Sequence, residues 1–301
     1  MAALQMSKRP KVLITGATDG IGQLAAMELA RQGADIILTA RSQSKAAITR
    51  ALIEAAAPGA AIELFYADFS DLRTVVAAGR AIAARHPHIE VLINNAGLHA
   101  FEQRITKGGF GEMIAVNYFA PWLLTMTLRE TLMRSAPARI ITVASEASRQ
   151  SGGLDIEADL LDTTAFTARG SSKIYGRTKL LDIMFSFELA RQLEGTGVTV
   201  NCLDPGFNVT SLGRELGFAG PLAKALTWLG IGNPDRGSGI IVRLATDPEF
   251  GADTGLYVSV KDARRLTPIA PANSEEHRRR LWISTATLLS TFLEDRDGTA
   301  R

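Results

Sequence analysis

Tyr175 and Lys179 are the two residues whose types and spacing most directly suggest chemistry. Side chains four positions apart leave a helix on the same side, about one turn from each other. A free phenol has a pKa of about 10, and lowering it to about 7 requires roughly 4 kcal/mol of differential stabilisation of the phenolate, which a nearby ammonium can supply. Surface tyrosines and lysines often share the same spacing. The elements around the pair must therefore decide whether it forms an acid–base site.

The composition is that of a globular protein with one large domain or two small ones, since 46% of its 301 residues are hydrophobic and 21% are charged. The 33 basic and 31 acidic side chains nearly balance, at a formal charge of +2. This balance argues against nucleic acid or an anionic membrane as the main partner. The single cysteine, Cys202, excludes an intrachain disulfide and fits a reducing compartment.

Targeting patterns are weak along the whole sequence. Residues 1–11 place a short apolar start before basic residues, the reverse order of a secretory signal. The longest uncharged stretch, 113–128, has 16 residues and contains Asn117 and Pro121, so we expect no membrane span. The sequence predicts a cytoplasmic protein.

A glycine-rich turn near the start of the chain indicates a dinucleotide site. Residues 11–15 are typical of a short buried strand, and residues 21–32 have the apolar spacing of a helix. The segment 15–22 between them contains three glycines, which let a backbone approach a pyrophosphate whose charge the helix N-terminus then meets. An ordinary tight turn is the alternative, but the flanking strand and helix are the context that the motif requires.

The second predicted strand, residues 35–41, ends where the adenosine ribose of such a site would lie. An NAD site usually places a carboxylate there, whereas this strand ends in Ala40 and Arg41. Arginine suits a 2′-phosphate, because a hydrogen bond to a charged group is worth about 1.5 to 3 kcal/mol. The sequence therefore favours NADP(H) over NAD(H). A surface arginine at a strand end is the alternative interpretation.

Strand and helix patterns continue to alternate along the chain. This alternation predicts one α/β domain, a Rossmann fold with a doubly wound, seven-stranded parallel sheet and helices on both faces. Its core would span about 10–260, followed by a helical appendage over about 262–301. The remaining predicted strands are 61–66, 89–93, 139–143, 198–203 and 255–258, and the remaining helices are 43–57, 71–85, 109–134, 174–192, 235–246 and 275–292.

Two polar residues, one after a strand and one inside a helix, could each have a structural role or a role in the site. Asp68 could bind the adenine amino group, or it could start the next helix together with Ser70. Asn117, in an apolar stretch, either caps an internal break in its helix or serves the active site. The three loop histidines, His86, His88 and His99, lack the spacing of a metal site, and we interpret them as polar loop residues.

Two segments lose the regular pattern. Residues 146–172 predict a long loop at the carboxyl end of the sheet, where insertions tend to be functional. Residues 207–234 are rich in glycine and leucine, which indicates a mobile apolar lid over a substrate pocket. Core packing is the alternative for this second segment.

Taken together, these motifs resemble the short-chain dehydrogenase/reductase family over about residues 10–260. The matching pieces occur in the family's order, and two further pieces, 205–212 and 279–282, are similar to its retinol-dehydrogenase-like branch. Many membrane-bound members of that branch have an N-terminal anchor that this sequence does not show, so we do not infer a retinoid substrate. The matching motifs are 15–22, 94–97, Val116 with Asn117, Ser145, 175–179, and Pro205 with Gly206.

The resemblance implies a role for each of four residues. Tyr175 would be the general acid and base, Ser145 would bind the substrate oxygen, Lys179 would lower the tyrosine pKa and bind the nicotinamide ribose, and Asn117 would hold a water linked to the lysine. Tyr175 and Lys179 would thus also contact the cofactor. The other implied cofactor contacts are Gly16, Gly20, Ile21 and Gly22 at the pyrophosphate, Asp68 and Asn95 at the adenosine end, and Thr210 at the carboxamide. Thr18, Asp19, Arg41, Phe69, Ala96, Gly97, Pro205 and Gly206 are further expected contacts of the cofactor.

The sequence departs from the family pattern at two places. Neither Thr18 nor Asp19 is basic, so Arg41 would carry most of the selectivity for the phosphate, and NAD(H) stays an alternative. Ser145 and Tyr175 are 175 − 145 = 30 residues apart, farther than in most of the family, although the retinol-dehydrogenase-like branch lengthens this loop too. Ser171 and Ser172 are therefore rival candidates for the serine role.

The resemblance implies an NADP(H)-dependent oxidoreductase that acts on a ketone, an aldehyde or a secondary alcohol, with an apolar substrate suggested by the composition of 207–234. A non-catalytic dinucleotide-binding module and a reductase of carbon–carbon double bonds are the alternatives. Family members often form dimers or tetramers through the helices that contain Asn117 and Tyr175.

Overall fold

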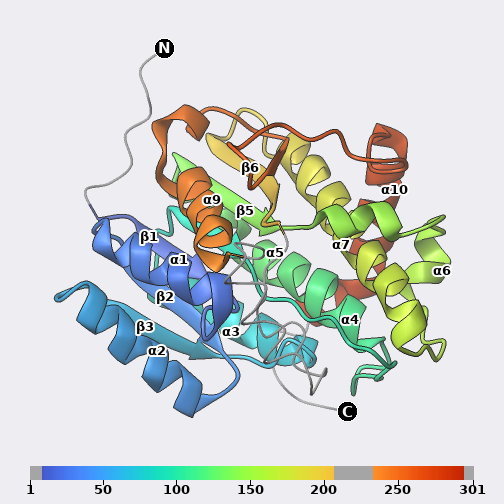
Figure 1. Ribbon diagram of the computed structural model, residues 1–301, viewed down its shortest axis with the longest axis horizontal. Coiled ribbons are helices and arrows are strands. Elements are labelled where there is room, and N and C mark those ends of the chain that lie inside the picture. Colours follow the sequence, from blue (N-terminus) through green and yellow to red (C-terminus); the bar gives the residue numbers. More distant parts are fainter. Residues whose placement is uncertain (1–8, 207–232, 295–301) are drawn as a thin grey trace.

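Seven parallel strands form a single sheet in the computed structural model, which describes residues 9–206 and 233–294 (Figure 1). The strand order is β3-β2-β1-β4-β5-β6-β7. The strands are β1 (Lys11–Ile14), β2 (Asp35–Ala40), β3 (Ile62–Tyr66), β4 (Val91–Asn94), β5 (Ala138–Val143), β6 (Val198–Asp204) and β7 (Leu256–Ser259). The predicted fold class, a single α/β domain with a Rossmann-type sheet, is confirmed.

The winding of the sheet reverses between β1 and β4, which pair directly although β2 and β3 separate them in the chain. In open parallel sheets, ligands bind in the crevice outside the carboxyl ends of the strands at such a point. Thr15 follows β1 and Asn95 follows β4. The topology therefore brings the glycine turn next to the segment 94–97.

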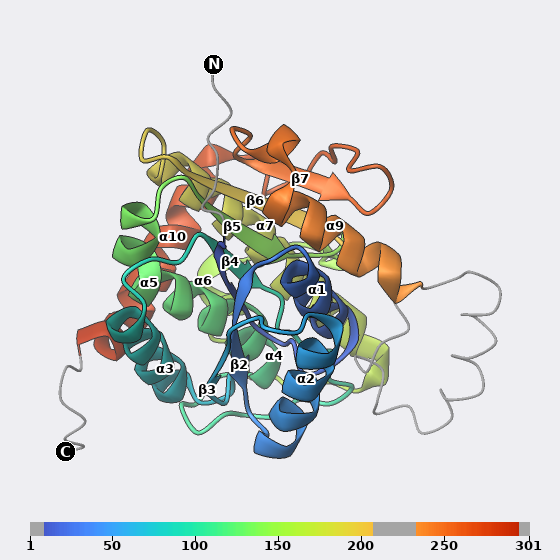
Figure 2. The same ribbon diagram turned by 90° about the vertical axis from the view of Figure 1, so that its left-hand side faces the viewer.

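Helices cover both faces of the sheet, as predicted. One face packs against α1 (Gly20–Arg31), α2 (Gln43–Ala56) and α9 (Pro234–Thr246), and the other against α3 (Leu72–Arg85), α5 (Ala120–Arg134) and α7 (Ala168–Gln192) (Figure 2). Alternating residues of one strand enter opposite layers, because Val12 and Ile14 belong to one buried cluster and Leu13 to the other. Burial on both faces explains the continuous apolar runs of the strands.

Short polar side chains begin the helices that leave the carboxyl edge of the sheet. Asp19 Oδ1 accepts a hydrogen bond from the Gly20 amide at 2.7 Å, and α1 starts there. Ser42 Oγ accepts from the Lys45 amide at the start of α2, and Asp71 Oδ1 accepts from the Arg73 amide at the start of α3. Such caps satisfy amides that have no partner inside their helix.

The single helix predicted over 109–134 is wrong in detail. It consists of α4 (Glu112–Ile114), a π-helical segment η1 (Ala115–Phe119) and α5. All five residues of η1 are buried, so the segment has no apolar stripe whose phase an extra residue could shift, and periodicity does not reveal the π-helical turn. Asn117 lies in the middle of this irregular turn and is buried.

The long loop predicted over 146–172 is also partly wrong. It contains a 3-10 turn, η2 (Glu146–Gln150), and a short helix, α6 (Ile156–Leu160), and α7 begins at Ala168 instead of residue 174. The first turn of α7 has a polar sequence, and its buried Ser171 makes a polar contact outside the helix, since its hydroxyl lies 3.1 Å from His99 Nε2. The predicted lid, 207–234, lies almost entirely outside the described residues.

The C-terminal helix α10 (Glu275–Glu294), part of the predicted helical appendage, packs into the hydrophobic core. The indole of Trp282 stacks on Phe185 of α7 with ring centroids 6.1 Å apart, and it lies 5.8 Å from the ring of Trp122 of α5. The buried hydroxyls of Thr285 and Tyr118 lie 2.8 Å apart. Thus α10 packs on both helices through which the resemblance predicts subunit association.

Within the described ranges, every helix is either too short or too polar to cross a lipid bilayer.

We predict that α10 stabilises the whole domain. Leu281 is buried in the interface of α10 with the domain, whereas Ile283, two positions later, is exposed. Leu281→Ala should reduce the free energy of unfolding by about 2–5 kcal/mol, because it leaves a cavity in a packed core. Ile283→Ala should change it by less than about 0.5 kcal/mol. Urea denaturation measures both, and equal effects of the two variants would contradict the packing described for α10.

Candidate active site

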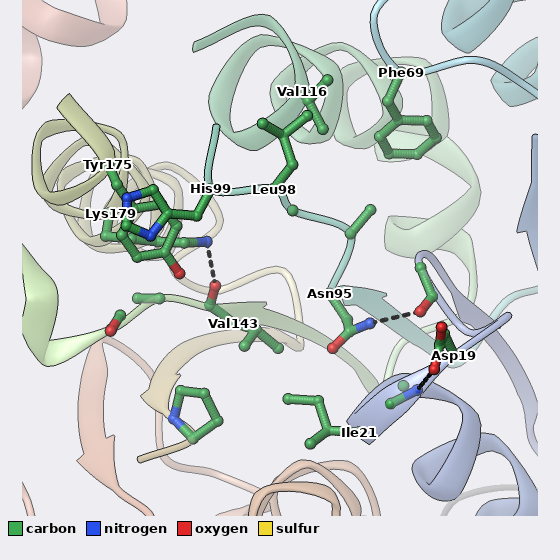
Figure 3. A pocket seen from close by; sticks show the side chains of 18 of the residues that line it. Asp19, Ile21, Phe69, Asn95, Leu98, His99, Val116, Val143, Tyr175 and Lys179 are labelled. Atoms are coloured by element: carbon green, nitrogen blue, oxygen red, sulfur yellow. Dashed lines mark hydrogen bonds between the residues drawn. The ribbon is translucent and has the colours of Figure 1, made fainter. Parts of the chain in front are cut away.

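A cavity of about 870 Å³ lies at the carboxyl ends of the strands and contains most of the predicted site residues (Figure 3). Asn117 does not line it, and Thr210 lies outside the described residues. The predicted residues that line it are Gly16, Thr18, Asp19, Gly20, Ile21, Gly22, Arg41, Asp68, Phe69, Asn95, Ala96, Gly97, Ser145, Tyr175, Lys179, Pro205 and Gly206. Residues from distant parts of the chain therefore share one cavity.

Asn95 fastens the glycine turn from the neighbouring strand. Its side-chain amide donates to the carbonyl oxygens of Thr15 at 2.9 Å and Gly16 at 3.2 Å, and the Thr15 hydroxyl accepts from the Asn95 and Ala96 amides. A Cβ atom at Gly22 would lie 2.3 Å from the Asn95 amide nitrogen and 2.7 Å from the Gly16 oxygen. Glycine is thus required at 22 because the turn folds back tightly on itself.

At the end of the cavity that would hold the adenosine, the two predicted contacts Arg41 and Asp68 differ in how free their side chains are to bind a ligand. Arg41 lines the cavity directly after β2 and is exposed. Asp68 lines it as well, but its carboxylate accepts from the amide and the hydroxyl of Ser70, at 3.0 and 2.8 Å. The cap of α3 is Asp71, so Asp68 orders the turn before the helix instead of capping it.

Lys179 lies on the cavity wall between β5 and α7. Its ammonium donates to the Val143 carbonyl oxygen at 2.8 Å and to Asp182 Oδ2 at 2.9 Å, and it lies 5.8 Å from the centre of the Tyr175 ring. Burial disfavours the charge, but Asp182 and Tyr175 outweigh this effect and raise the pKa of Lys179. The lysine is therefore a fixed cation beside the phenol.

The pKa of Tyr175 is raised, not lowered, in this structure. Burial is the main cause, and the negative charges of Asp182 and Asp204 add to it, while the ammonium of Lys179 acts in the opposite direction. The predicted effect of the lysine is present, but it does not decide the direction of the shift. The spacing of Tyr175 and Lys179 in the sequence reveals the cation but not the carboxylates of Asp182 and Asp204, which only the fold brings near the phenol.

Ser145 lies at the turn that leads from β5 into η2, where its hydroxyl accepts from the Ala147 amide at 3.1 Å. It lines the cavity together with Tyr175, as does Ser172. Ser171 is fully buried and donates to the Ala168 carbonyl oxygen at 2.9 Å. Ser145 and Ser172 thus remain candidates for binding a substrate oxygen, whereas Ser171 has a different role.

Close backbone packing holds Ser145 near Tyr175. A Cβ at Gly176 would lie 2.5 Å from the Ala147 carbonyl oxygen and 3.0 Å from the Ser151 amide nitrogen. Only glycine lets α7 approach η2 this closely. The residue after the tyrosine therefore sets the contact between the helix and the turn that carries the serine.

Asn117 supports the cavity wall from behind. Its side chain accepts from the Leu98 amide at 2.8 Å and donates to the Leu98 carbonyl oxygen at 2.9 Å and to the Thr178 hydroxyl at 3.0 Å. It thereby connects the loop after β4 to the turn of α7 between the tyrosine and the lysine. Asn117 lies in the helix irregularity, but its side chain bonds only Leu98 and Thr178 and caps no helix end, and its role in the active site stays a prediction.

His99 is a site residue that the sequence reading missed. Its ring stacks on Tyr175 with centroids 4.6 Å apart and planes 13° apart, and on Phe101 at 4.9 Å (Figure 3). Its Nε2 lies within hydrogen-bonding distance, 3.1 Å, of the Ser171 hydroxyl oxygen. A lone histidine in a loop gives no sequence signal for this contact.

The part of the cavity outside the expected cofactor contacts is polar in several places. Besides His99 it contains Gln150 and the ion pair between Arg104 and Glu112. The predicted apolar character rested on 207–234, which lies outside the described residues.

Comparison with known proteins gives the same assignment as the geometry. The family model of short chain dehydrogenases matches residues 10–155. Human retinol dehydrogenase 13 is 32% identical over 283 residues, which cover 92% of this chain and 84% of that protein. Human retinol dehydrogenase 14 is 35% identical over 287 residues, covering 90% and 83%, and human polyprenol dehydrogenase is 32% identical over 253 residues, covering 82% and 75%.

Solved structures share the fold over nearly their whole length. An uncharacterised protein from Mycobacterium paratuberculosis superposes with a TM-score of 0.71 at 25% identity, covering 96% of this chain and 97% of the other. A protein from Beutenbergia cavernae, described as an NAD(P)-dependent gluconate 5-dehydrogenase with bound NADP, gives 0.67 at 25% identity, covering 85% and 96%. The sheet, the cavity and these relatives agree, and the chain belongs to the short-chain dehydrogenase/reductase family of oxidoreductases.

Proposed function

We propose that the protein transfers hydride between NADP(H) and a ketone, an aldehyde or a secondary alcohol, with Tyr175 as the general acid and base. The observation that carries the proposal is the shared cavity, which has the glycine turn at one end and Tyr175, Lys179 and Ser145 at the other. Its volume of about 870 Å³ is ample for a ligand of cofactor size. The tight turn at Gly22 and the start of α1 fit a pyrophosphate.

The residues of the chain would act on the proton and on the position of the substrate. The nicotinamide supplies or accepts the hydride when it is bound. In reduction, the Tyr175 hydroxyl donates its proton to the carbonyl oxygen, while the Ser145 hydroxyl holds that oxygen with a hydrogen bond. The Lys179 ammonium, 5.8 Å from the ring centre, stabilises the phenolate that remains. In oxidation, the phenolate takes the alcohol proton and the same contacts operate in reverse.

Support for the phosphate-bearing cofactor comes from Arg41, which directly follows β2 and lines the cavity, since arginine at the end of this strand suits a 2′-phosphate. The relative from Beutenbergia cavernae contains NADP. NAD(H) is the alternative, since the glycine turn itself contributes no basic residue.

For the substrate we propose an apolar alcohol or carbonyl compound. The support is the composition of 207–234 and the names of relatives that refer to retinol and polyprenol. The polar wall formed by His99 and Gln150 would then face the reacting group and not the apolar part. A cytoplasmic location and a dimeric or tetrameric assembly stay predictions.

Tyr175→Phe tests the proposed chemistry. The variant should lower kcat by about 10²–10⁴-fold, because it removes the transferable proton, and should leave the affinity for NADPH nearly unchanged. The measurement is NADPH oxidation or NADP⁺ reduction over a panel of carbonyl and alcohol compounds, with cofactor binding followed by fluorescence. Retained turnover in the variant would exclude Tyr175 as the acid.

Stabilisation by NADPH without turnover of the wild-type protein would favour a regulatory dinucleotide-binding module, and saturated products from activated alkenes would favour the double-bond reductase.

Arg41→Ala tests the choice of cofactor. Loss of a charge-assisted hydrogen bond should weaken NADPH binding by about tenfold to 150-fold and leave NADH binding almost unchanged. Arg50→Ala is the control, because Arg50 is exposed on α2 and pairs with Glu54 at 2.9 Å, outside the cavity. Equal losses for NADPH and NADH, or a loss in the control, would count against the phosphate role of Arg41.

Gly22→Ala tests the glycine turn. The added methyl group should displace the Asn95 amide, weaken NADPH binding at least about tenfold and destabilise the domain by about 1–3 kcal/mol. Gly239→Ala on α9 is the control, because a Cβ there meets no atom within 4 Å. Calorimetric binding and thermal unfolding measure both effects. Unchanged NADPH affinity in Gly22→Ala would place the pyrophosphate elsewhere.

A further inference from the structure

Asp182 is a buried carboxylate directly behind the catalytic pair. It lies three residues after Lys179 on α7, its side chain is 1% exposed, and its Oδ2 is 2.9 Å from the lysine ammonium. Its second oxygen, Oδ1, is buried and has no hydrogen-bond partner among the described residues. An ionised carboxylate is costly to bury, and a half-satisfied one is more costly still. Packing alone therefore does not account for an aspartate at this position.

Lys179 is the only cation that faces Asp182 within the described part of the chain. Two other titratable groups also adjoin it, Tyr118 from η1 and Cys202 from β6. Burial and the charge of Asp182 raise the pKa of both, so both are neutral at physiological pH. The negative charge of Asp182 therefore acts on two neighbours that matter for proton transfer, the Lys179 ammonium and the Tyr175 phenol.

The lysine is held from two sides. One bond runs to Val143 at the end of β5 and the other to Asp182 on its own helix, which leaves one of its three N–H groups for the cavity. A buried lysine without an anion tends to lose its proton. The carboxylate thus fixes both the position and the charge of the group that must stabilise the phenolate.

We propose that Asp182 is a positioning residue of the proton-transfer site: it keeps Lys179 charged and fixed against β5, and its own charge adds to burial in holding the proton on Tyr175, so that the site is set for carbonyl reduction. This inference rests on the proposed function, because it concerns the same tyrosine. It adds the direction of the reaction that the site favours.

The charge of Asp182 acts on its titratable neighbours with a definite sign. Removing a negative charge from a buried site makes it easier for every neighbouring group to lose a proton. Tyr175 and Lys179 interact closely, so their protons leave in steps that belong to the pair. When Asp182 is replaced by a neutral residue, the first of these protons should be lost at a lower pH. Asp204 on β6 also raises the pKa of Tyr175, and the His99 ring lies on the phenol face, but neither contacts the lysine in the described structure. The protonated phenol is the form that reduction needs, whereas oxidation needs the phenolate.

The effect should depend on pH in a predictable way. Burial raises the pKa of the Asp182 carboxyl to about 6, even though Lys179 acts to lower it. Above this pH the carboxylate is charged and acts on its neighbours. Below it Asp182 takes up a proton, and the aspartate and a neutral replacement should behave alike.

Spectroscopic titration of tyrosinate absorbance in the full-length free protein tests the proposal without any substrate. Subtracting the titration of Tyr175→Phe, made in each background, isolates Tyr175 from the other tyrosines. Asp182→Asn should move the Tyr175 titration to lower pH by about one unit or more. No shift, or a shift to higher pH, would overturn the proposal, and a residue that only stabilises the fold would produce no shift.

Glu188→Gln is the matched control. Glu188 lies on the same helix, its side chain is 2% exposed, and it pairs with Arg191 three residues later at 2.6 Å. The variant makes the same change from a buried carboxylate to an amide about two turns farther along α7, in an ion pair whose arginine is 42% exposed, and should leave the Tyr175 titration unchanged. An equal shift in this control would mean that any loss of charge from α7 has the same effect, and the specific role of Asp182 would be lost.

The wild-type protein provides a second test that does not depend on the folding of the asparagine variant. The proposal requires Tyr175 to be protonated at pH 7, so the difference between wild type and Tyr175→Phe should show no tyrosinate there. A phenolate at pH 7 would overturn it. These spectra do not involve turnover, so failure here is distinguishable from failure of the proposed function, which the kinetics of Tyr175→Phe decide.

Discussion

The buried ammonium of Lys179 is the interaction on which the rest of the site depends. A charge in a cavity wall must be satisfied where it lies, and its two partners belong to different layers of the fold, Val143 at the end of β5 and Asp182 on α7. Because the lysine must bond both partners, it fixes the position of α7 along the end of β5. Tyr175, one turn before the lysine, is thereby aimed into the crevice that the strand order creates.

Much of the fold could be predicted because its signals are local. Continuous apolar runs mark the strands, helical spacing marks their connections, and the glycines of 15–22 mark the turn between the first two elements. The order of these pieces was enough for the sheet and the family. Boundaries failed where polar contacts replace apolar spacing, as in the first turn of α7, or where one extra residue enters a helix, as at Asn117.

The candidate site was predictable in its residue types but not in its contacts. Tyr175, Lys179 and Ser145 could be found by spacing and motif order, and the structure places all three on one cavity. His99 and Asp182 could not, because a ring stacked across 76 residues and the burial of a single carboxylate depend on the tertiary structure. The direction of the tyrosine pKa was missed for the same reason, since burial and distant carboxylates exceed the effect of the neighbouring lysine.

The close packing at Gly176 has a consequence for the unusual separation of the serine and the tyrosine. Backbone contact between α7 and η2 sets how far Ser145 lies from Tyr175, because the glycine brings the helix against Ala147 and Ser151. The segment between Ser151 and Ala168 therefore begins and ends at this contact, and its length does not change the distance between Ser145 and Tyr175. None of residues 152–167 lines the cavity, and only Ile156 and Leu160 among them belong to the buried core. The exposed parts of this segment can therefore change in length while Tyr175 and Ser145 keep their alignment.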